Sequence, residues 1–289
     1  MLRKIPLFSY TLIMDNSKHD KITPTADLIS YFRIFSDIPY TKEIAEMTNA
    51  KEIAEKMLGE NFKDSMFLAP MSEARYKRID IQAKKYKNIL EVAVGRSPRD
   101  LIFTENPEVN YVATDLPDSL KNHEMIIKEL IERHNLKRPN LHFASANALN
   151  GNELMSASSL LPEGPVAIIS EGFIVYLPMD EKKIFLKNVL DILVRRGGCL
   201  ITSDINFTKR NNTVSGIMDS ISSTTGRDIR DLNFENEEVA KKFLSEVGFD
   251  SEIIFDPVDV VSMKELKLEN DPQTQRVMSF PVWVLTIKK

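Results

Sequence analysis

Four residues suited to ligand binding stand directly after short apolar runs. Gly95 follows ILEVAV, Asp115 follows EVNYVAT, Asn147 follows LHFASA, and Glu171 follows PVAIIS. In an open α/β sheet, ligands bind beyond the carboxyl ends of the strands. A glycine lets the backbone approach a ligand closely, and a carboxylate can hold ribose hydroxyls. If the runs are strands, this pattern predicts a nucleoside-cofactor site along one edge of a sheet.

Three of these residues also have a purely structural interpretation. Gly95 can be a turn glycine, because only one glycine of a GxGxG pattern is present. Asp115 stands twenty residues after Gly95, the spacing of a ribose-binding acid, but an acid before Pro117 also suits a helix N-terminus. Asn147 can meet an adenine edge or close an Asx turn. Glu171 lies in an apolar stretch where a buried carboxylate is costly, so we expect it to meet a ligand amino group.

The surrounding sequence predicts an α/β core over residues 86–289. Apolar runs over 88–94, 108–115, 141–147, 165–172 and 197–205 alternate with helical patterns that start at Pro117 and near residues 180 and 235. Such alternation predicts a parallel sheet covered by helices on both faces. Two further runs, SEIIFDPVD and SFPVWVLTIKK, are separated by a segment that we expect to be a loop over about 260–275, so they can pair antiparallel.

Residues 1–85 predict an N-terminal helical cap, since TADLISYFRIF places apolar side chains at helical spacing. No Pro/Gly/Ser-rich linker separates this cap from the core, so we expect one domain over 1–289. The polar segment 206–232 is expected to be a surface excursion above the sheet. We expect the cap and this excursion to form the substrate pocket.

Composition excludes several classes of function. The chain has 289 residues, 38 basic and 42 acidic, and its net charge of −4 argues against nonspecific nucleic-acid binding. A single cysteine excludes an internal disulfide and a cysteine-cluster metal site, and the four histidines lack metal-ligand spacing. No apolar run is long enough to span a bilayer, and no signal-cleavage pattern follows the N-terminus. We therefore expect a cytoplasmic protein with no membrane or nucleic-acid partner.

Short motifs occur in a specific order between about residue 23 and residue 250. They resemble the leucine carboxyl methyltransferase family, which includes bacterial polyketide-type O-methyltransferases. In ILEVAVGRSPRDL, Gly95 and Arg99 match the family pattern LGxGxDTR, whereas Ala93, Ser97 and Pro98 depart from it. The further matches are Ala74-Arg75-Tyr76, Asp115-Leu116-Pro117, EGFIVYL at 171–177, and the TA, R and S positions of TPTADLISYFRIFSD.

The resemblance implies a Rossmann-like class I methyltransferase fold with a seven-stranded, mostly parallel sheet, and S-adenosylmethionine (SAM) as cofactor. It also implies a role for each matching position. Arg75 would hold the methionyl carboxylate, Gly95 would line the methionine, Asp115 would take the ribose, Asn147 and Ala148 would flank the adenine, and Glu171 would meet the amino group. For Arg75 the alternative is a surface salt bridge with Glu73 or Asp80.

The expected activity is O-methylation of a carboxylate, on a small molecule or a peptide terminus. A carboxylate is ionised at neutral pH and needs no general base, and the enzyme's part is alignment. Tyr176 or an arginine would orient the acceptor, whereas a hydroxyl acceptor would require a base that the sequence does not single out. The alternative is a SAM-binding regulatory protein with little or no transfer activity, which the altered glycine loop and Asn147 suggest. A nicotinamide-dependent oxidoreductase shares the strand-end Asp115 but lacks the full GxGxxG.

Overall fold

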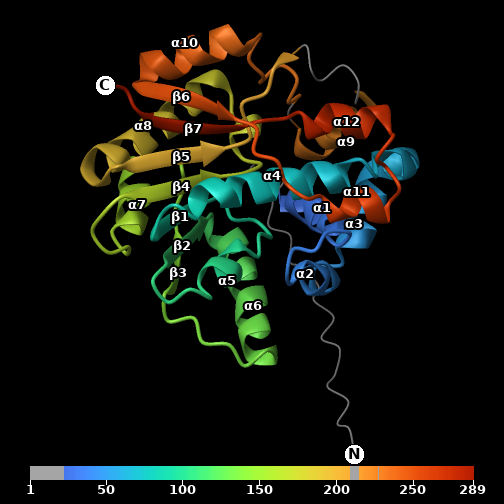
Figure 1. The fold of residues 1–289 in the computed structure, drawn as a ribbon, viewed down its shortest axis with the longest axis horizontal. Coiled ribbons are helices and arrows are strands. Elements are labelled where there is room, and N and C mark those ends of the chain that lie inside the picture. The colour runs from blue at the N-terminus through green and yellow to red at the C-terminus, as the bar shows by residue number, and fades with distance from the viewer. Residues whose placement is uncertain (1–22, 209–214, 227) are drawn as a thin grey trace, which may run out of the picture.

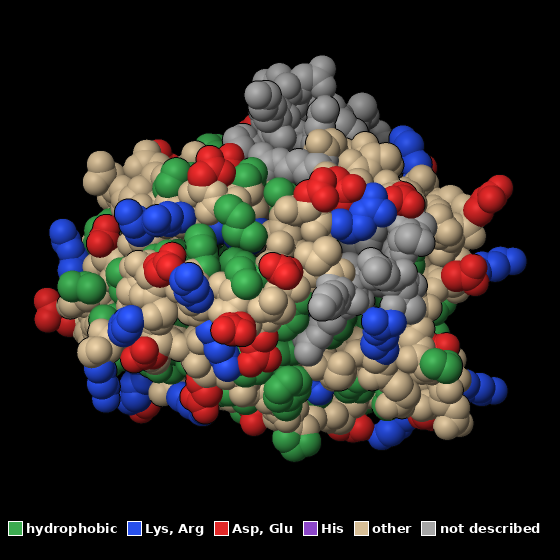
Figure 2. Space-filling view, turned by 90° about the horizontal axis from the view of Figure 1, so that it is seen from above, with side chains coloured by type: hydrophobic (Ala, Val, Ile, Leu, Met, Phe, Trp, Pro, Cys, Tyr) green, Lys and Arg blue, Asp and Glu red, His purple; other side chains and the backbone are tan. Residues whose placement is uncertain are grey.

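The computed structural model describes residues 23–208, 215–226 and 228–289. The N-terminal apolar stretch and the start of the expected cap lie outside these residues, as does 209–214 within the expected surface excursion. None of the described helices is both long and apolar enough to cross a lipid bilayer. On the face drawn in Figure 2, acidic and basic side chains of the described residues are interspersed.

The described strands form one sheet in the order β3-β2-β1-β4-β5-β7-β6. Strands β1 to β5 pair in parallel, and β7 pairs antiparallel to both β5 and β6. This order with one antiparallel strand is the class I methyltransferase sheet, as the sequence predicted. The strand bounds are β1 Asn88–Val92, β2 Asn110–Asp115, β3 Leu141–Ser145, β4 Val166–Ser170, β5 Gly198–Thr202, β6 Phe249–Ile254 and β7 Val282–Ile287.

Helices cover both faces because the central strands carry apolar side chains on both sides (Figure 1). In β1, Leu90 packs into the core on one face and Ile89 into the core on the other. The first core includes side chains of α7 (Gly151–Ser158), α8 (Met179–Arg196) and α10 (Glu237–Val247). The second includes side chains of α4 (Leu68–Ala83), α5 (Arg99–Phe103) and α6 (Pro117–Arg133).

Local sequence signals start two of these helices at the carboxyl edge of the parallel strands. Pro117 occupies the first turn of α6, where its missing N–H leaves no hydrogen bond unmade. Asn150 precedes α7, and its side chain accepts a hydrogen bond from the backbone N–H of Asn152 at 3.1 Å. Both helices therefore begin directly beside the ends of β2 and β3.

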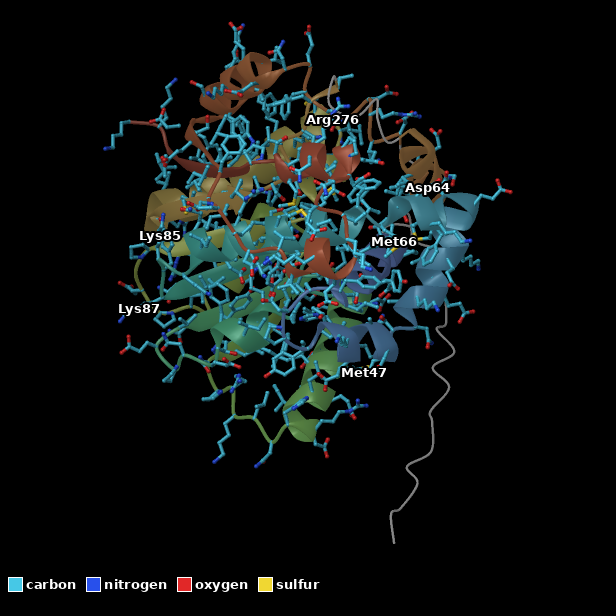
Figure 3. The ribbon with its side chains drawn as sticks, turned by 45° about the vertical axis from the view of Figure 1, so that its right-hand side comes forward. Met47, Asp64, Met66, Lys85, Lys87 and Arg276 are labelled. Atoms are coloured by element: carbon cyan, nitrogen blue, oxygen red, sulfur yellow. The ribbon has the colours of Figure 1, made fainter. Side chains whose placement is uncertain are left out.

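In the expected cap over 1–85, the described residues form α1 (Thr23–Arg33), α2 (Thr41–Met47), α3 (Ala50–Leu58), the short 3₁₀ helix η1 (Gly59–Ser65) and α4. Helix α4, the last of these, runs from the other cap elements to the sheet. In Figure 3, Met66 lies beside the cap before α4 begins, whereas Lys85 and Lys87 lie at the far side of the sheet after it ends. A cap cluster of buried apolar side chains joins these elements, and its members include Leu28, Phe32, Leu58, Phe67 and Leu68.

The segment 206–232 is not the surface excursion that we expected. It contains α9 (Ser215–Thr225), and Ile217 and Ile221 of this helix are 5% and 9% exposed. Together with Ile229 they pack into the cap cluster. Isoleucines four residues apart lie on one helix face. The other residues of α9 are mostly Ser and Thr, so this narrow apolar stripe gives only a weak helical pattern in the sequence.

The expected loop over about 260–275 is wrong, because this connection contains α11 (Val261–Glu265) and α12 (Pro272–Met278). The start of α11 is held by Glu73 of α4, whose carboxylate accepts hydrogen bonds from the N–H groups of Val261 at 3.0 Å and Ser262 at 2.8 Å. A helix start that is capped from a residue so distant in the chain has no local sequence signal. The antiparallel pairing of β6 and β7 is as predicted.

Candidate functional site

A cavity of about 270 Å³ lies at the carboxyl ends of the parallel strands, between the sheet and the cap. Residues from the cap, from the turns after β1 to β5, from α9 and from the end of α12 line it. Each position that the sequence predicted for the cofactor or the acceptor is on this lining: Arg75, Gly95, Asp115, Asn147, Ala148, Glu171 and Tyr176. The structure thus brings all seven residues to one place, and their individual roles remain predictions.

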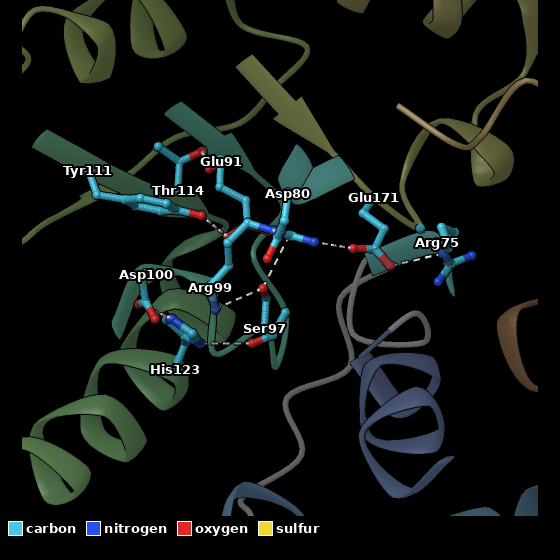
Figure 4. A network of polar contacts seen from close by, with 12 residues as sticks. Arg75, Asp80, Glu91, Ser97, Arg99, Asp100, Tyr111, Thr114, His123 and Glu171 are labelled. Carbon is cyan, nitrogen blue, oxygen red and sulfur yellow. Dashed lines mark hydrogen bonds and ion pairs between the residues drawn. The ribbon is translucent and has the colours of Figure 1, made fainter. Parts of the chain in front are cut away.

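Glu171, directly after β4, is bound by three arginines. Its Oε1 accepts from Arg33 Nη2 at 2.6 Å. Figure 4 shows the other two contacts, in which Oε1 accepts from Arg75 Nε at 2.8 Å and Oε2 accepts from Arg99 Nη2 at 2.8 Å. Burial raises the pKa of the Glu171 carboxyl, but the three guanidinium groups outweigh burial and hold that pKa well below its usual range. These arginines explain how an ionised carboxylate is stable in an apolar stretch.

The alternative interpretation of Arg75 as a surface salt bridge with Glu73 or Asp80 is wrong. Arg75 pairs with Glu171, whereas Asp80 pairs with the Nε of Arg99 at 2.6 Å. Glu73 instead caps α11 and pairs with a lysine of its own helix. Because Arg75 and Glu171 lie 96 positions apart in the sequence, their pairing could not be read from local spacing.

Arg99 is the fully buried centre of this network. Besides Asp80 and Glu171 it binds the carboxylate of Glu91, and its guanidinium lies 4.1 Å from the ring centroid of Tyr76. Burial lowers the pKa of Arg99, but the three carboxylates raise it to a net value well above the ordinary range. For Asp80 burial prevails over Arg99 and raises the pKa to about 6.

Asp115 joins the end of β2 to the turn after β1. Its Oδ2 accepts from the N–H of Gly95 at 3.0 Å, and its Oδ1 accepts from the N–H of Leu116 at 2.8 Å. Burial raises the pKa of this carboxyl, partly offset by those two N–H groups. Each oxygen has a further lone pair that can accept from a ligand hydroxyl. The interaction with the start of α6 and a ribose-binding role are therefore compatible.

The turn that carries Gly95 has a strained backbone. Gly95 has φ +57°, and a Cβ added there would lie 3.2 Å from the Cβ of Ala26 in α1. Ala93, which replaces the first glycine of the family motif, also has φ +57°. An alanine pays for the left-handed conformation that glycine adopts freely. The sequence therefore departs from the family at a position where the backbone still favours glycine.

His123 of α6 supports the same turn from outside the cavity. Its Nδ1 lies 3.1 Å from the carbonyl oxygen of Gly95, and its Nε2 lies 2.8 Å from Oδ2 of Asp100. A carbonyl and a carboxylate are both acceptors. His123 therefore links the turn after β1 to Asp100 at the start of α5. No sequence pattern indicated this role, because His123 has no other histidine or cysteine near it on its predicted helix.

At the adenine end of the expected site, Asn147 adopts the Asx turn that the sequence left open. Its Oδ1 accepts from the N–H of Leu149 at 3.0 Å, and its own N–H donates to Oε2 of Glu153 at 2.7 Å. The carbonyl of Ala148 accepts from Nδ2 of Asn188 at 3.0 Å. Both residues line the cavity on a fixed loop, which is compatible with flanking a ligand base.

Asp204, after β5, fixes the turn that carries Glu171 and Tyr176. Its carboxylate accepts from the N–H groups of Gly172 at 2.9 Å, Phe173 at 2.7 Å and Ile174 at 2.9 Å. Burial raises the pKa of the Tyr176 hydroxyl, which is hydrogen-bonded to Thr25 in the cap. Sequence reasoning assigned no role to Asp204, Arg33, Glu91 or Arg99, although Arg33 and Arg99 matched positions of the family motifs.

No family model and no curated protein matches the chain. Among solved structures, a DUF574 family protein from Streptomyces avermitilis is 14% identical over 92% of this chain and 97% of that chain, with a TM-score of 0.56. PigF, solved with SAH, is 10% identical over 80% of this chain and 61% of that chain, with a TM-score of 0.50. The fold is that of the class I methyltransferases. At these identities the likeness extends to the fold alone.

Substitution Ala93→Gly is expected to stabilise the class I sheet of this protein. An alanine in the left-handed conformation destabilises the folded state by about 1–2 kcal/mol, and glycine removes this strain. Glycine also gives the unfolded chain more conformational entropy, which offsets about 0.4–1 kcal/mol of the stabilisation. We expect the free energy of unfolding in urea to rise by about 0.5–1 kcal/mol. The control Ala146→Gly, at a buried cavity position without positive φ, should lower it. A loss of stability in Ala93→Gly would contradict the strain.

The pKa of Asp80 predicts a pH-dependent stability. Its folded pKa of about 6 lies above the ordinary 3.8, so between these values the folded chain holds a proton that the unfolded chain has lost. Stability from this group is therefore complete below pH 3.8 and is lost as the pH rises through about 6. The free energy of unfolding in urea is measured for the wild type and for Asp80→Asn from about pH 4 to pH 7. The wild-type free energy minus that of the variant should fall as the pH rises.

The matched comparison is Glu171→Gln. Because the folded pKa of Glu171 is lowered, its stabilisation is present above its unfolded pKa and is lost on acidification. The wild-type free energy of unfolding minus that of Glu171→Gln should therefore rise with pH over the acid range. The same slope for both variants would refute the opposite signs of these two shifts.

Proposed function

We propose that this protein is a SAM-dependent O-methyltransferase, similar to the leucine carboxyl methyltransferase family, that forms methyl esters. The observation that carries this proposal is the meeting of the motif residues. Arg75, Gly95, Asp115, Asn147 and Glu171 come from separate segments and line one cavity at the ligand-binding edge of a class I methyltransferase sheet. A cytoplasmic location remains a prediction.

The residues present fit the cofactor's chemistry. Asp115 offers carboxylate lone pairs for ribose hydroxyls, and Gly95 brings the backbone to the cavity without a side chain. The adjacent Arg75 and Glu171 have opposite charges, and together they complement the carboxylate and ammonium of an amino-acid zwitterion. Asn147 and Ala148 would flank the adenine. PigF, which shares the fold, was solved with SAH, and this supports the same class of ligand here.

When bound, SAM would supply a methyl group on a positively charged sulfur. That methyl group would pass to an acceptor carboxylate oxygen, and the electrons of the C–S bond would remain on sulfur as a neutral thioether. The acceptor is an anion before the reaction, so no proton has to be removed. The chain's part is to align the acceptor and to exclude water.

The side chains around the cavity favour a carboxylate over a hydroxyl acceptor. Among the described residues that line it there is no histidine, lysine or cysteine. Of the carboxylates, Glu171 is neutralised by three arginines and Asp204 accepts three backbone hydrogen bonds. A hydroxyl acceptor would need a base to take its proton. These two carboxylates are poorly suited to that task. The other carboxylates of the lining are Asp115, which accepts two backbone hydrogen bonds, and Glu181 in the first turn of α8.

The ribose assignment predicts a loss of cofactor affinity in Asp115→Asn. The amide retains one acceptor oxygen for the backbone but loses the charge-assisted bonds to a ligand, each worth about 1.5–3 kcal/mol. We expect the dissociation constant for S-adenosylhomocysteine (SAH), measured by calorimetry, to rise at least about tenfold. Asp118→Asn is the control, since this exposed residue lies three positions along in the first turn of α6. Unchanged affinity in Asp115→Asn would exclude the ribose role.

The ester-forming reaction predicts a base-labile product. The purified chain is incubated with methyl-labelled SAM and pairs of carboxylic acids and alcohols that share a carbon skeleton. We expect label to pass to the acids and to be released as methanol by mild alkali, which hydrolyses esters but not ethers. Label in alkali-stable ethers would instead identify a hydroxyl acceptor. SAH binding without transfer to any acceptor would favour the regulatory alternative.

A further inference from the structure

The cavity extends beyond the motif residues into an apolar chamber under the cap. Leu28 of α1, Phe67 and Met71 at the start of α4, Ile221 of α9 and Val277 of α12 line this part. These segments are far apart in sequence and gather on one side of the sheet edge in Figure 1. We call this part the cap chamber. Its lining favours an apolar occupant, since burying apolar surface is the main source of affinity in such a space.

One arginine that lines the cavity has a buried N–H group without a hydrogen-bond partner among the described residues. Arg33 is 6% exposed and lines the cavity, and its Nε has no hydrogen-bond partner among the described residues. By contrast, Arg99 is held by three carboxylates, and Arg96 is paired with Asp27 at 2.7 Å. A buried N–H without a partner is costly, and an anionic oxygen is the acceptor that best satisfies it.

We propose that the cap chamber binds a hydrophobic carboxylic acid, with its carboxylate at Arg33 and its apolar body among the chamber side chains. This inference rests on the proposed function, because it names the acceptor of that reaction. A peptide terminus fits less well, since its backbone N–H and C=O groups would enter an apolar lining without partners. A neutral alcohol would offer the Nε–H of Arg33 an uncharged acceptor, which forms a weaker hydrogen bond than a carboxylate does.

The acceptor class predicts how affinity depends on chain length and headgroup. Binding of butanoate, hexanoate, octanoate and decanoate to the full chain is measured by calorimetry, with and without saturating SAH. Each methylene buried is worth about 0.8 kcal/mol, so affinity should rise by up to about fourfold per methylene until the chamber is filled. Octan-1-ol should bind at least about tenfold more weakly than octanoate, since a charged hydrogen bond is worth about 1.5–3 kcal/mol.

Two matched pairs of variants separate the headgroup from the chamber. Arg33→Met should weaken octanoate at least about tenfold and leave octan-1-ol unchanged, whereas Arg133→Met, at an exposed position of α6, should change neither. Met71 lies four residues before Arg75 on α4, hence on the same helix face. Met71→Gln should flatten the chain-length dependence, and Met125→Gln, at a position 45% exposed, should not. If Arg33→Met fails to fold, the affinities of the wild-type protein for the acid series and for octan-1-ol still test the proposal.

Three results would overturn this inference: affinity independent of chain length, equal affinity for octanoate and octan-1-ol, or tighter binding of short peptides than of the acids. The proposed function fails separately. If hydrophobic acids bind as expected but receive no label from SAM, the binding of acids in the cap chamber is supported and methyl transfer to them is excluded. If label passes to short, hydrophilic acids without any dependence on chain length, the proposed methyl transfer is supported and acceptor binding in the cap chamber is excluded.

Discussion

The buried carboxylate of Glu171 is the constraint on which the site depends. Its oxygens accept hydrogen bonds from Arg33 of α1, Arg75 of α4 and Arg99 of α5. Removing one partner of a buried ion pair leaves an uncompensated charge and costs about 3–5 kcal/mol. One side chain at the end of β4 therefore connects α1 and α4 of the cap to the start of α5. Charge, and not apolar packing alone, determines where the cap meets the sheet edge.

Charge balance limits what the site can bind. Three guanidinium groups face three carboxylates, those of Glu171, Glu91 and Asp80, so the formal charges cancel. Glu91 and Asp80 lie on the side of the network away from the cavity, where burial raises the pKa of both carboxyl groups. The side that faces the cavity presents arginines fixed by Glu171. A zwitterion or an anion is thus compatible with this arrangement, and preorganised charges of this kind need no rearrangement when a ligand binds.

The sequence predicted the positions of site residues better than their partners. Gly95, Asp115, Asn147 and Glu171 were located because each follows an apolar run, and the parallel sheet brings such ends together. Arg33 could not be assigned, because its partner Glu171 lies 138 positions away. Helices α9 and α12 were missed for a related reason: their apolar stripes are short, and the cap that covers them is built from the other end of the chain. Local sequence patterns predict where strands end, whereas contacts between residues that are distant in the sequence can be identified only in the folded structure.

In the proposed reaction, the arginine that orients the acceptor also opposes its reactivity. A guanidinium bound to a carboxylate withdraws negative charge from the oxygen that must attack, while an apolar chamber that excludes water has the opposite effect. Arg33 does not present a full positive charge, because Glu171 already accepts from its Nη2 at 2.6 Å. It can therefore hold an acid in place through Nε–H without neutralising it fully. On this argument Glu171 has two effects on the acceptor: it fixes the position of Arg33, and it weakens the field that Arg33 exerts on the nucleophile.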